Sequence, residues 1–394
     1  MIFKLKDLCD FIGRGVSPAY TEDKINGVMV INQKCIRDNR INFDLVRFTD
    51  INKKKVSDIK YLKNDDILIN STGVGTLGRI AQIKNVDKNI TVDSHVTIVR
   101  PNKEIDPRFL GYNLFMQQEF IESLGEGSTG QIELSKTKLS EFVDIEVPPL
   151  KEQQKISKIL SSLDEKIEIN RKINENLEEQ AKEIFKRWFV DYEFPNEEGQ
   201  PYKSSGGEMI ESELGLIPKG WEVKKLESII NISNGRRPKN KIKLKNRQYC
   251  IPIIGSSCIT GYTDEFLYDE HVLVIGRVGT HGIVQRFKEK IWVSDNAMVI
   301  KSNYYEYTNQ ILNNICYENL NVGSTQPLIT QSDIKKHLIK VPINRLINSF
   351  EKIVSSLYEK YYFNECEIQK LSSLRDTLLP KLMTGEIDVS KIDI

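Results

Sequence analysis

The sequence predicts an α+β protein: two β-rich globular domains separated by two long antiparallel coiled-coil helices, related by an internal pseudo-two-fold repeat. Three observations support this prediction. Several motifs recur in the same order in the two halves of the 394-residue chain. Each half ends in a long segment with helical periodicity, and each begins with short apolar runs broken by Gly, Asn and Asp, which are typical of strands and turns.

The first recurring motif is a glycine loop, STGVGTLGRI at 71–80, in which Gly73, Gly75 and Gly78 have the spacing G-x-G-x-x-G. A nucleotide-binding loop needs a strand before the glycines and a helix after them. The residues before the loop, DDILI, suit a strand, but the residues after it, RIAQI, also suit a strand. A glycine-rich hairpin is therefore favoured over a dinucleotide or S-adenosylmethionine site.

The same loop returns in the second half as VGTHGIV at 278–284, and its neighbours return with it. FKLKDLCDFI at 3–12 is similar to WEVKKLESII at 221–230, and NITVDSHVTIVRP at 89–101 is similar to KIWVSDNAMVIKS at 290–302. In both halves a Gly-Ser-Thr segment and a glutamine follow, and then a Val-Pro step. The chain is therefore two copies of one unit.

A long helix is predicted after each Val-Pro step, because ISKILSSLDEK at 156–166 aligns without a gap to FEKIVSSLYEK at 350–360. The apolar positions are three, four or seven residues apart, which is the seam of a coiled coil. Asn170 and Asn364 are equivalent; facing each other, they would set the register, and the alternative is that both point to solvent. The predicted helix-pair interface is Ile156, Leu163, Ile167, Asn170, Leu177, Ile184, Phe350, Leu357, Tyr361, Asn364, Leu371 and Leu378.

These patterns divide the chain into six segments. An acidic linker joins the repeats, and Trp188, Phe194 and Met209 would anchor it as an ordered tether, although a flexible linker is the alternative. The Trp188-Phe189 pair suits either core packing or contact with a partner. The predicted segments are globular domain 1 at 1–147, helix 1 at 148–190, the linker at 191–218, globular domain 2 at 219–342, helix 2 at 343–383 and a tail at 384–394.

The composition excludes some function classes. The net charge is +1, so no global field attracts nucleic acid or membrane, but GRRPKNKIKLKNR at 235–247 is strongly basic and suits either phosphate contact or a solvated loop. The six cysteines show no metal-ligand spacing, so no metal site is predicted. No apolar run approaches membrane-spanning length, and a cytoplasmic protein is expected.

Three parts of the sequence together resemble the specificity subunits of type I restriction–modification systems: the stretch from VPPLKEQQ to YEFP at 147–195, the linker YKSSGGEMIESELGLIPKGWEV at 202–223, and the twin Gly-Thr-x-Gly hairpins. The resemblance implies two target recognition domains, each reading half of a split sequence in double-stranded DNA. It also implies that the helices bind two modification (methyltransferase) subunits. Partner subunits would then use S-adenosylmethionine, ATP and magnesium, with restriction and translocase subunits in the full complex, and this chain would have no cofactor.

No catalytic residue is predicted, because the chain has neither an N-P-P-[YF] motif for amino-methylation nor a G-x-x-x-x-G-K-[ST] phosphate loop. The glycine hairpins either bring backbone close to DNA or only turn the chain within a β-core. For DNA, basic side chains suit phosphates, and Arg, Asn, Gln, Ser and Thr suit base edges. The candidate DNA-binding residues are Lys34, Arg37, Arg40, Arg79, Ser128, Thr129, Gln131, Arg236, Arg237, Lys239, Lys241, Arg277, Ser324, Thr325 and Gln326.

Other functions remain open at this point. The chain would be a methyltransferase if the 71–80 loop bound S-adenosylmethionine, or a coiled-coil scaffold if it bound no DNA. It could also serve a system whose partner chain combines cleavage and methylation. If the helices set the distance between half-sites, adding helical turns to both should lengthen the recognised spacer.

Overall fold

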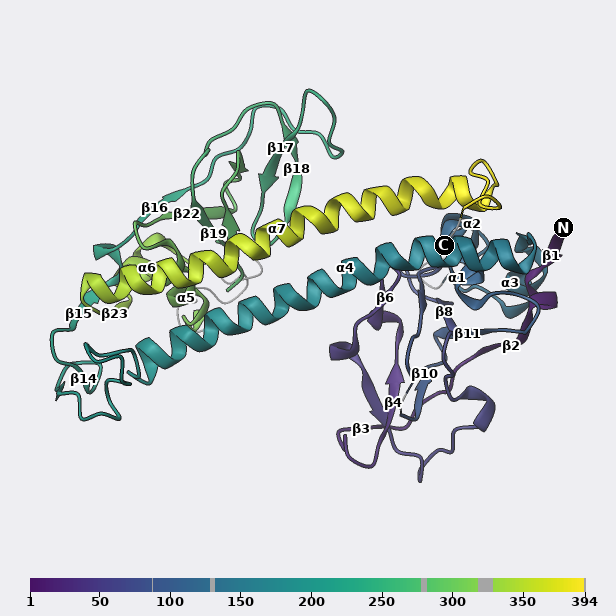
Figure 1. The fold of residues 1–394 in the computed structure, drawn as a ribbon, viewed down its shortest axis with the longest axis horizontal. Coiled ribbons are helices and arrows are strands. Elements are labelled where there is room, and N and C mark those ends of the chain that lie inside the picture. Colours follow the sequence, from purple (N-terminus) through teal and green to yellow (C-terminus); the bar gives the residue numbers. More distant parts are fainter. Residues whose placement is uncertain (87, 128–131, 278–281, 318–328, 393–394) are drawn as a thin grey trace. The chain divides into compact units, whose positions relative to one another are not determined.

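The computed structural model describes residues 1–86, 88–127, 132–277, 282–317 and 329–392. The chain forms two compact units (Figure 1). Unit 1 comprises Met1–Asn170 and Cys366–Ile394, and unit 2 comprises Arg171–Glu365. Each unit therefore contains one globular domain together with a segment from each of the two long helices.

The described residues of unit 1 contain two four-stranded sheets and two two-stranded ribbons, of which one pairs β5 with β6. In the first sheet the order is β2-β11-β8-β9 and all neighbours are antiparallel; in the second it is β10-β4-β7-β3, with β10 parallel to β4. The other ribbon pairs β1 with β12. The strands are β1 Ile2–Lys4, β2 Cys9–Arg14, β3 Tyr20–Thr21, β4 Val28–Ile31, β5 Ile36–Arg37, β6 Arg40–Ile41, β7 Arg47–Thr49, β8 Ile67–Asn70, β9 Ile80–Gln82, β10 Ile90–Val92, β11 Val96–Pro101 and β12 Asp144–Glu146; the helices are α1 Pro107–Met116, α2 Gln118–Ser123 and α3 Lys136–Phe142.

Unit 2 repeats this topology. Its first sheet has the order β16-β22-β19-β20, its second has β18-β17-β21 with β17 parallel to β21, and β15 pairs with β23 as β1 does with β12. The predicted internal repeat is thus confirmed in strand order and direction. The elements are β15 Glu222–Lys225, β16 Asn231–Asn234, β17 Ile251–Ile254, β18 Ile259–Thr263, β19 Val272–Gly276, β20 Val284–Phe287, β21 Trp292–Val293, β22 Ala297–Lys301, β23 Leu338–Val341, α5 Tyr305–Asn313 and α6 Gln331–Lys336, with β13 Met209–Ile210 and β14 Ile217–Pro218 in the linker.

The 71–80 glycine loop joins two antiparallel strands, β8 and β9, as the hairpin alternative requires. Gly73 has φ +104° and Gly78 has φ +78°, a region that residues with a Cβ rarely adopt. A Cβ on Gly78 would also lie 2.9 Å from the Cβ of Glu122. Because a strand and not a helix follows the glycines, the loop lacks the helix N-terminus that would hold a nucleotide phosphate.

The two long helices are α4, Leu150–Phe185, which continues as a π-helical turn over Lys186–Val190, and α7, Asn344–Met383. Within unit 1 the start of α4 runs antiparallel to the end of α7, since Asp164 pairs with Arg375 at 2.8 Å and Lys166 with Glu367 at 3.5 Å. Within unit 2 the end of α4 lies against the start of α7, where the ring centroids of Phe185 and Phe350 are 6.0 Å apart. Each unit thus holds an antiparallel helix pair.

All of the predicted interface residues are buried or half-buried, including Asn170 and Asn364, which are each 1% exposed. The prediction that these two asparagines meet each other needs correction. Asn170 Nδ2 donates to Glu367 Oε2 at 2.7 Å, and Asn364 Nδ2 donates to Asn174 Oδ1 at 2.8 Å. Asn174 is one turn beyond Asn170 on the same helical face and seven residues after Ile167, so it occupies a heptad position of the seam that the predicted set did not include.

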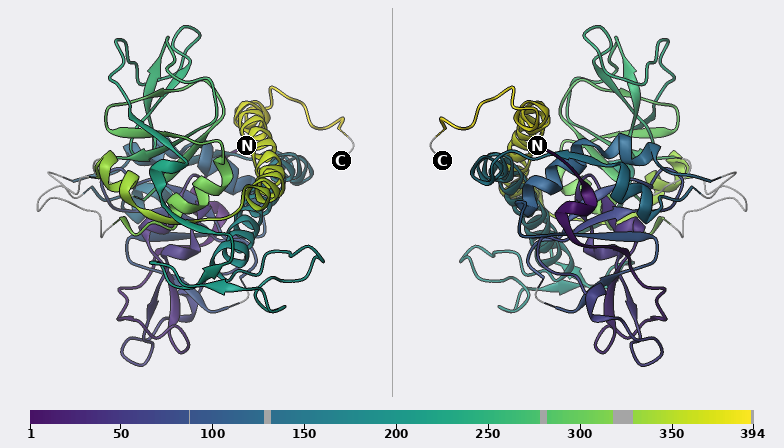
Figure 2. Two further views of the ribbon diagram at one scale, coloured as in Figure 1. Left: turned by 90° about the vertical axis from the view of Figure 1, so that its left-hand side faces the viewer. Right: turned by 90° about the vertical axis from the view of Figure 1, so that its right-hand side faces the viewer.

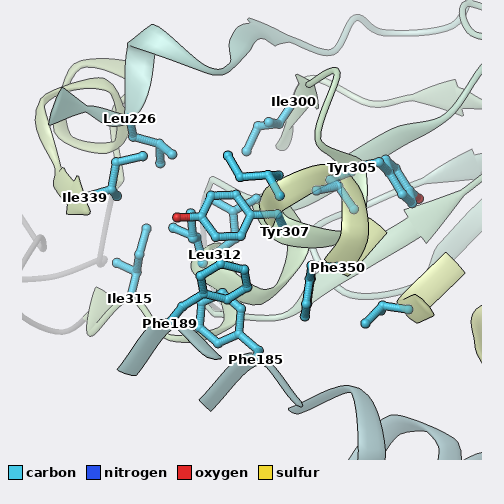
Figure 3. Packing of buried hydrophobic residues seen from close by; sticks show 14 of the residues in the cluster. Phe185, Phe189, Leu226, Ile300, Tyr305, Tyr307, Leu312, Ile315, Ile339 and Phe350 are labelled. Atoms are coloured by element: carbon cyan, nitrogen blue, oxygen red, sulfur yellow. The ribbon is translucent and has the colours of Figure 1, made fainter. Parts of the chain in front are cut away.

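An aromatic core in unit 2 surrounds Tyr307 (Figure 3). The ring of Phe189 lies 4.8 Å from that of Tyr307 and 5.0 Å from that of Phe350, and Phe185 packs beside them. Trp188 belongs to the same cluster. The Trp188-Phe189 pair is therefore part of the core and is not available to a partner.

The linker after α4 is anchored to the same core of unit 2. Phe194 stacks on Tyr202 and Trp221, with ring centroids 4.6 and 5.6 Å apart, and Met209 packs against the cluster. The prediction of an ordered tether is confirmed.

The tail after α7 plays the corresponding part in unit 1. Figure 2 shows it, in yellow, leaving the end of α7. Val389 is 3% exposed, and Lys155 Nζ on α4 donates to the carbonyls of Val389 and Ser390 at 3.2 and 2.9 Å. Leu379, Leu382 and Met383 enter the core of unit 1. Among the described residues, no helix is long and apolar enough to cross a membrane.

Candidate DNA-binding surface

In unit 1, four separate segments meet at one place beside the first sheet, here named the junction. It consists of residues 15–16 after β2, Ser71 after β8, His95 before β11 and Leu134 before α3. Backbone hydrogen bonds close it: Gly15 N to Val96 O at 3.0 Å, Val16 N to Val92 O at 2.9 Å, Ser71 N to His95 O at 2.8 Å and Leu134 N to Ser71 O at 2.8 Å. The glycine loop begins at the junction, with Ser71, and the segment that contains the Gly-Ser-Thr motif ends there, with Leu134.

Unit 2 contains the same junction, with the same four kinds of bond. Its segments are residues 235–236, Arg277, Asn296 and Ile329. The bonds are Gly235 N to Ala297 O at 3.0 Å, Arg236 N to Val293 O at 2.8 Å, Arg277 N to Asn296 O at 2.9 Å and Ile329 N to Arg277 O at 3.3 Å. Two copies of one surface feature are therefore built from the two repeats.

A glycine is required at the first segment of each junction, because backbone approaches backbone closely there. A Cβ on Gly15 would lie 2.0 Å from the carbonyl oxygen of Val92, and a Cβ on Gly235 would lie 2.2 Å from that of Ser294. No side chain tolerates such a contact with a carbonyl that cannot move independently. The recurrence of Gly15 and Gly235 was a signal that the sequence reading did not use.

The predicted basic residues of unit 2 surround its junction. Arg236 and Arg237 directly follow Gly235, and both side chains are exposed; Arg237 Nε lies 2.6 Å from Asp295 Oδ2. Arg277 is itself a member of the junction and is half-buried. The basic run is thus attached to the sheet at its first residues.

Further along the same run, Lys239 and Lys241 are also exposed. Lys239 Nζ lies 4.0 Å from Glu265 Oε1, at the limit of an ion pair. Ile242 exchanges two backbone hydrogen bonds with Tyr262 of β18, at 3.0 and 2.9 Å. The run is therefore held along the edge of the second sheet with its charges facing solvent.

The predicted basic residues of unit 1 differ from one another in their contacts. Lys34 is exposed, and its N–H donates to Asn32 Oδ1 at 2.9 Å. Arg79 Nη2 donates to Gly75 O at 2.7 Å, which stiffens the glycine hairpin. Arg37 and Arg40 lie on the β5–β6 ribbon, where Arg40 pairs with Glu168 of α4 at 2.7 Å and Arg37 approaches Asp38 at 3.6 Å. Arg40 is thus already paired with a carboxylate on the helix, which offsets part of its charge.

Six predicted residues, Ser128, Thr129, Gln131, Ser324, Thr325 and Gln326, lie outside the described residues. The ends of the first segment are described. Glu126 and Glu133 exchange backbone hydrogen bonds at 2.9 and 2.8 Å, and Leu134 joins the junction. Ile329 does the same after the second segment.

A profile of the type I restriction–modification DNA specificity domain matches residues 1–179 and 218–370. This chain belongs to that family. It is 31% identical over 354 residues to the specificity subunit of the type I restriction enzyme MjaIX of Methanocaldococcus jannaschii, covering 82% of this chain and 78% of the relative. It is 24% identical to the HindI specificity subunit of Haemophilus influenzae over 95% of this chain and 98% of that one. The fold is similar to that of the crystallised S subunit of a type I system from M. genitalium, with a TM-score of 0.56 and 18% identity over 97% and 95% of the two chains.

Membership in this family makes DNA recognition the role of the two globular domains. Each junction also has an exposed polar side chain that was not among the predicted DNA-binding residues. His95 and Asn296 are both exposed, although the strands that they precede are buried. Thr72 Oγ1 is hydrogen-bonded to His95 Nδ1, and Gln33 is hydrogen-bonded to the same hydroxyl of Thr72. The alignment of VDSHV with VSDNA already placed His95 opposite Asn296, but it did not show that either is exposed.

Burial shapes the electrostatics beside the unit 1 junction. Burial raises the pKa of Asp93, which is 4% exposed, while the His95 N–H, donating to Asp93 Oδ1 at 2.9 Å, works in the opposite direction. Burial is also the main cause that raises the pKa of Tyr20, whose ring stacks under the guanidinium of Arg47 at 3.3 Å. Across the described residues, no group of three or more His, Cys, Asp and Glu side chains could hold a metal ion.

Proposed function

We propose that this chain is the specificity subunit of a type I restriction–modification complex and that each unit reads one half of a bipartite sequence in double-stranded DNA. The observation that carries the proposal is the duplicated junction: four matching backbone hydrogen bonds in each unit hold the segment after the first strand of the first sheet and one exposed polar side chain, and in unit 1 they also hold the start of the glycine hairpin. Two copies of one reading surface suit a target with two halves.

In this proposal the contacts divide by chemistry. Arg236, Arg237, Lys239 and Lys241 of unit 2, and Lys34 of unit 1, bind phosphates, since they are exposed cations. Arg277 and the polar side chains of the junctions face base edges. The glycine hairpin allows backbone to approach the duplex, because Gly75 has open space where a Cβ would project.

The long helices have two roles in the proposal. They set the distance between half-sites, as continuous helices that pass from one unit to the other. They also bind two modification subunits. Exposed apolar side chains on the helices suit a protein partner: Ile169, at 52%, in unit 1, and Phe363, at 61%, in unit 2.

Catalysis in the complex belongs to the partners. The modification subunits transfer methyl groups from S-adenosylmethionine, and restriction subunits use ATP and magnesium for translocation and cleavage. This chain supplies the DNA sequence preference and the scaffold on which the partners are placed.

The experiment is long-read methylation sequencing of a host that expresses this chain with its neighbouring modification subunit, compared with the same host lacking this chain. One methylated, split motif that depends on the chain is the expected result. If both proteins are soluble and associated but no new methylation is found, the specificity role is wrong and a scaffold without DNA recognition is favoured.

A further inference from the structure

His95 and Asn296 occupy equivalent places in the two junctions. The carbonyl of His95 accepts from Ser71 N, and the carbonyl of Asn296 accepts from Arg277 N. The next residues, Val96 and Ala297, begin the central strands β11 and β22 and are each 0% exposed. One exposed polar side chain is therefore held at the same point of each unit, because its own carbonyl is hydrogen-bonded and the residue after it is buried in the sheet.

The chemistry of these two side chains suits bases better than phosphates. A phosphate offers only acceptors and negative charge, and in unit 2 the exposed Arg236 and Arg237 beside the junction already meet that need. A neutral amide presents a donor and an acceptor together, as does a neutral imidazole, and this pattern matches base edges in the major groove. In unit 2, Asp295, the residue before Asn296, pairs with Arg237 at 2.6 Å, so a phosphate ligand and a base reader are adjacent.

In unit 1 the ring of His95 is oriented by a hydrogen bond of 2.7 Å between its Nδ1 and Thr72 Oγ1. In the tautomer with the proton on Nδ1, the imidazole donates to Thr72, and the Thr72 hydroxyl is free to donate to Gln33 Oε1, 3.2 Å away. In that tautomer Nε2 is an acceptor. The donors that bases present in the major groove are the amino groups of adenine and cytosine.

We infer that His95 and Asn296 are specificity-determining residues, one for each half-site, an inference that rests on the proposed function. His95 Nε2 accepts a hydrogen bond from the exocyclic amine of an adenine or a cytosine in the half-site of unit 1. Asn296 reads an adenine in the half-site of unit 2 through its amide. Thr72 and Gln33 are positioning residues that orient the imidazole and hold its tautomer.

The test compares the methylated motifs of complexes that carry the full-length chain, again by long-read methylation sequencing. In the His95→Ala complex, one adenine or cytosine position of one half-site should become degenerate, with discrimination falling about 10-fold or more, while the other half-site is unchanged. Asn296→Ala should have the same effect on an adenine in the other half-site. Thr72→Val, which keeps the shape but removes the hydroxyl, should weaken discrimination at the His95 position only.

Ser94→Ala is the matched control, since Ser94 is the half-buried neighbour of His95, and its motif should equal that of the wild type. An unchanged motif with His95→Ala, or degeneracy at a guanine or thymine, would overturn this inference while leaving the proposed function intact. A uniform loss of methylation over all sites would also overturn it, because it would make His95 a general affinity contact. Absence of any split motif with the wild-type chain would instead refute the proposed function itself.

Discussion

Neutralising Arg236 and Arg237 together is the most direct test of the phosphate contacts. Both follow Gly235 at the unit 2 junction, and both side chains are exposed. Each phosphate that a protein neutralises contributes about 0.9 to the slope of log K against log salt concentration. Two full contacts would therefore contribute about 1.8 to that slope. Arg237 already faces Asp295, so its share is smaller, and the expected reduction lies between about 0.9 and about 1.8.

The assay is fluorescence anisotropy of the assembled complex on its own target DNA, titrated at several salt concentrations from about 50 to about 200 mM. The Arg236→Gln/Arg237→Gln chain should bind more weakly at low salt and converge on the wild type at high salt, because the lost term is electrostatic. Folding should be unaffected, since an exposed ion pair such as Arg237–Asp295 contributes at most about 1 kcal/mol.

A control with the same loss of charge separates a local contact from the general field. Lys203 lies in the linker and Lys219 directly after it, both in the same unit, and both are exposed. The Lys203→Gln/Lys219→Gln chain should keep the wild-type slope. Unchanged affinity and slope in the arginine variant, or an equal change in the lysine variant, would refute the assignment of the basic run to phosphate contact.

Three further predictions concern stability. Gly15→Ala and Gly235→Ala should each lower the free energy of unfolding by about 3 kcal/mol or more, because the new methyl group meets a carbonyl oxygen at 2.0 or 2.2 Å. The control Gly75→Ala, which has open space for the methyl group and φ +71°, should lower it by only about 1–2 kcal/mol. Equal losses for the three variants in urea unfolding would contradict this explanation. Val389→Ala should destabilise unit 1 by about 2 kcal/mol, because buried carbon atoms are lost and a cavity is left. Lys391 is exposed, so Lys391→Ala should not change the stability. Limited proteolysis would detect the difference, and equal resistance of the two variants to the protease would exclude a structural role for the tail. Burial raises the pKa of Glu351 above its ordinary value of 4.5, so the folded state binds the proton more tightly than the unfolded state does. The stability that this carboxyl contributes at low pH is therefore lost as the pH rises through the folded pKa. Glu351→Gln, which can still accept from Tyr307 N, should flatten this fall in urea unfolding measured as the pH rises from 4.5, and an unchanged pH profile would argue against it.

Much of the architecture was predictable because it depends on local patterns. The apolar run DDILI predicted the strand before the glycine loop, and the residues after Gly78 predicted a second strand and favoured a hairpin over a nucleotide loop. The heptad spacing from Ile156 onward predicted a seam, whose residues are all at least half-buried. These features are set by neighbours within a few residues along the chain, so periodicity is enough to find them.

The polar interior of the helix pairs was not predictable in detail. The heptad count placed Asn170 and Asn364 at equivalent positions, but their hydrogen-bond partners, Glu367 and Asn174, depend on how two helices are shifted along each other. A relative shift of one turn exchanges the facing side chains without changing either helix. The register is therefore a property of the packed pair and not of either sequence segment alone.

The sequence by itself determined that this protein is a repeat of one β-rich unit and one long helix, and that each repeat carries a glycine hairpin and a Gly-Ser-Thr segment. Only the tertiary structure decided that residues as distant as Gly15, Ser71, His95 and Leu134 form one junction, and that Gly235, Arg277, Asn296 and Ile329 form another. Composition points to arginine and lysine for DNA, whereas exposure at the end of a buried strand singled out His95 and Asn296. The physical reason is that backbone hydrogen bonds between distant segments, and the burial around them, arise only when the sheets assemble.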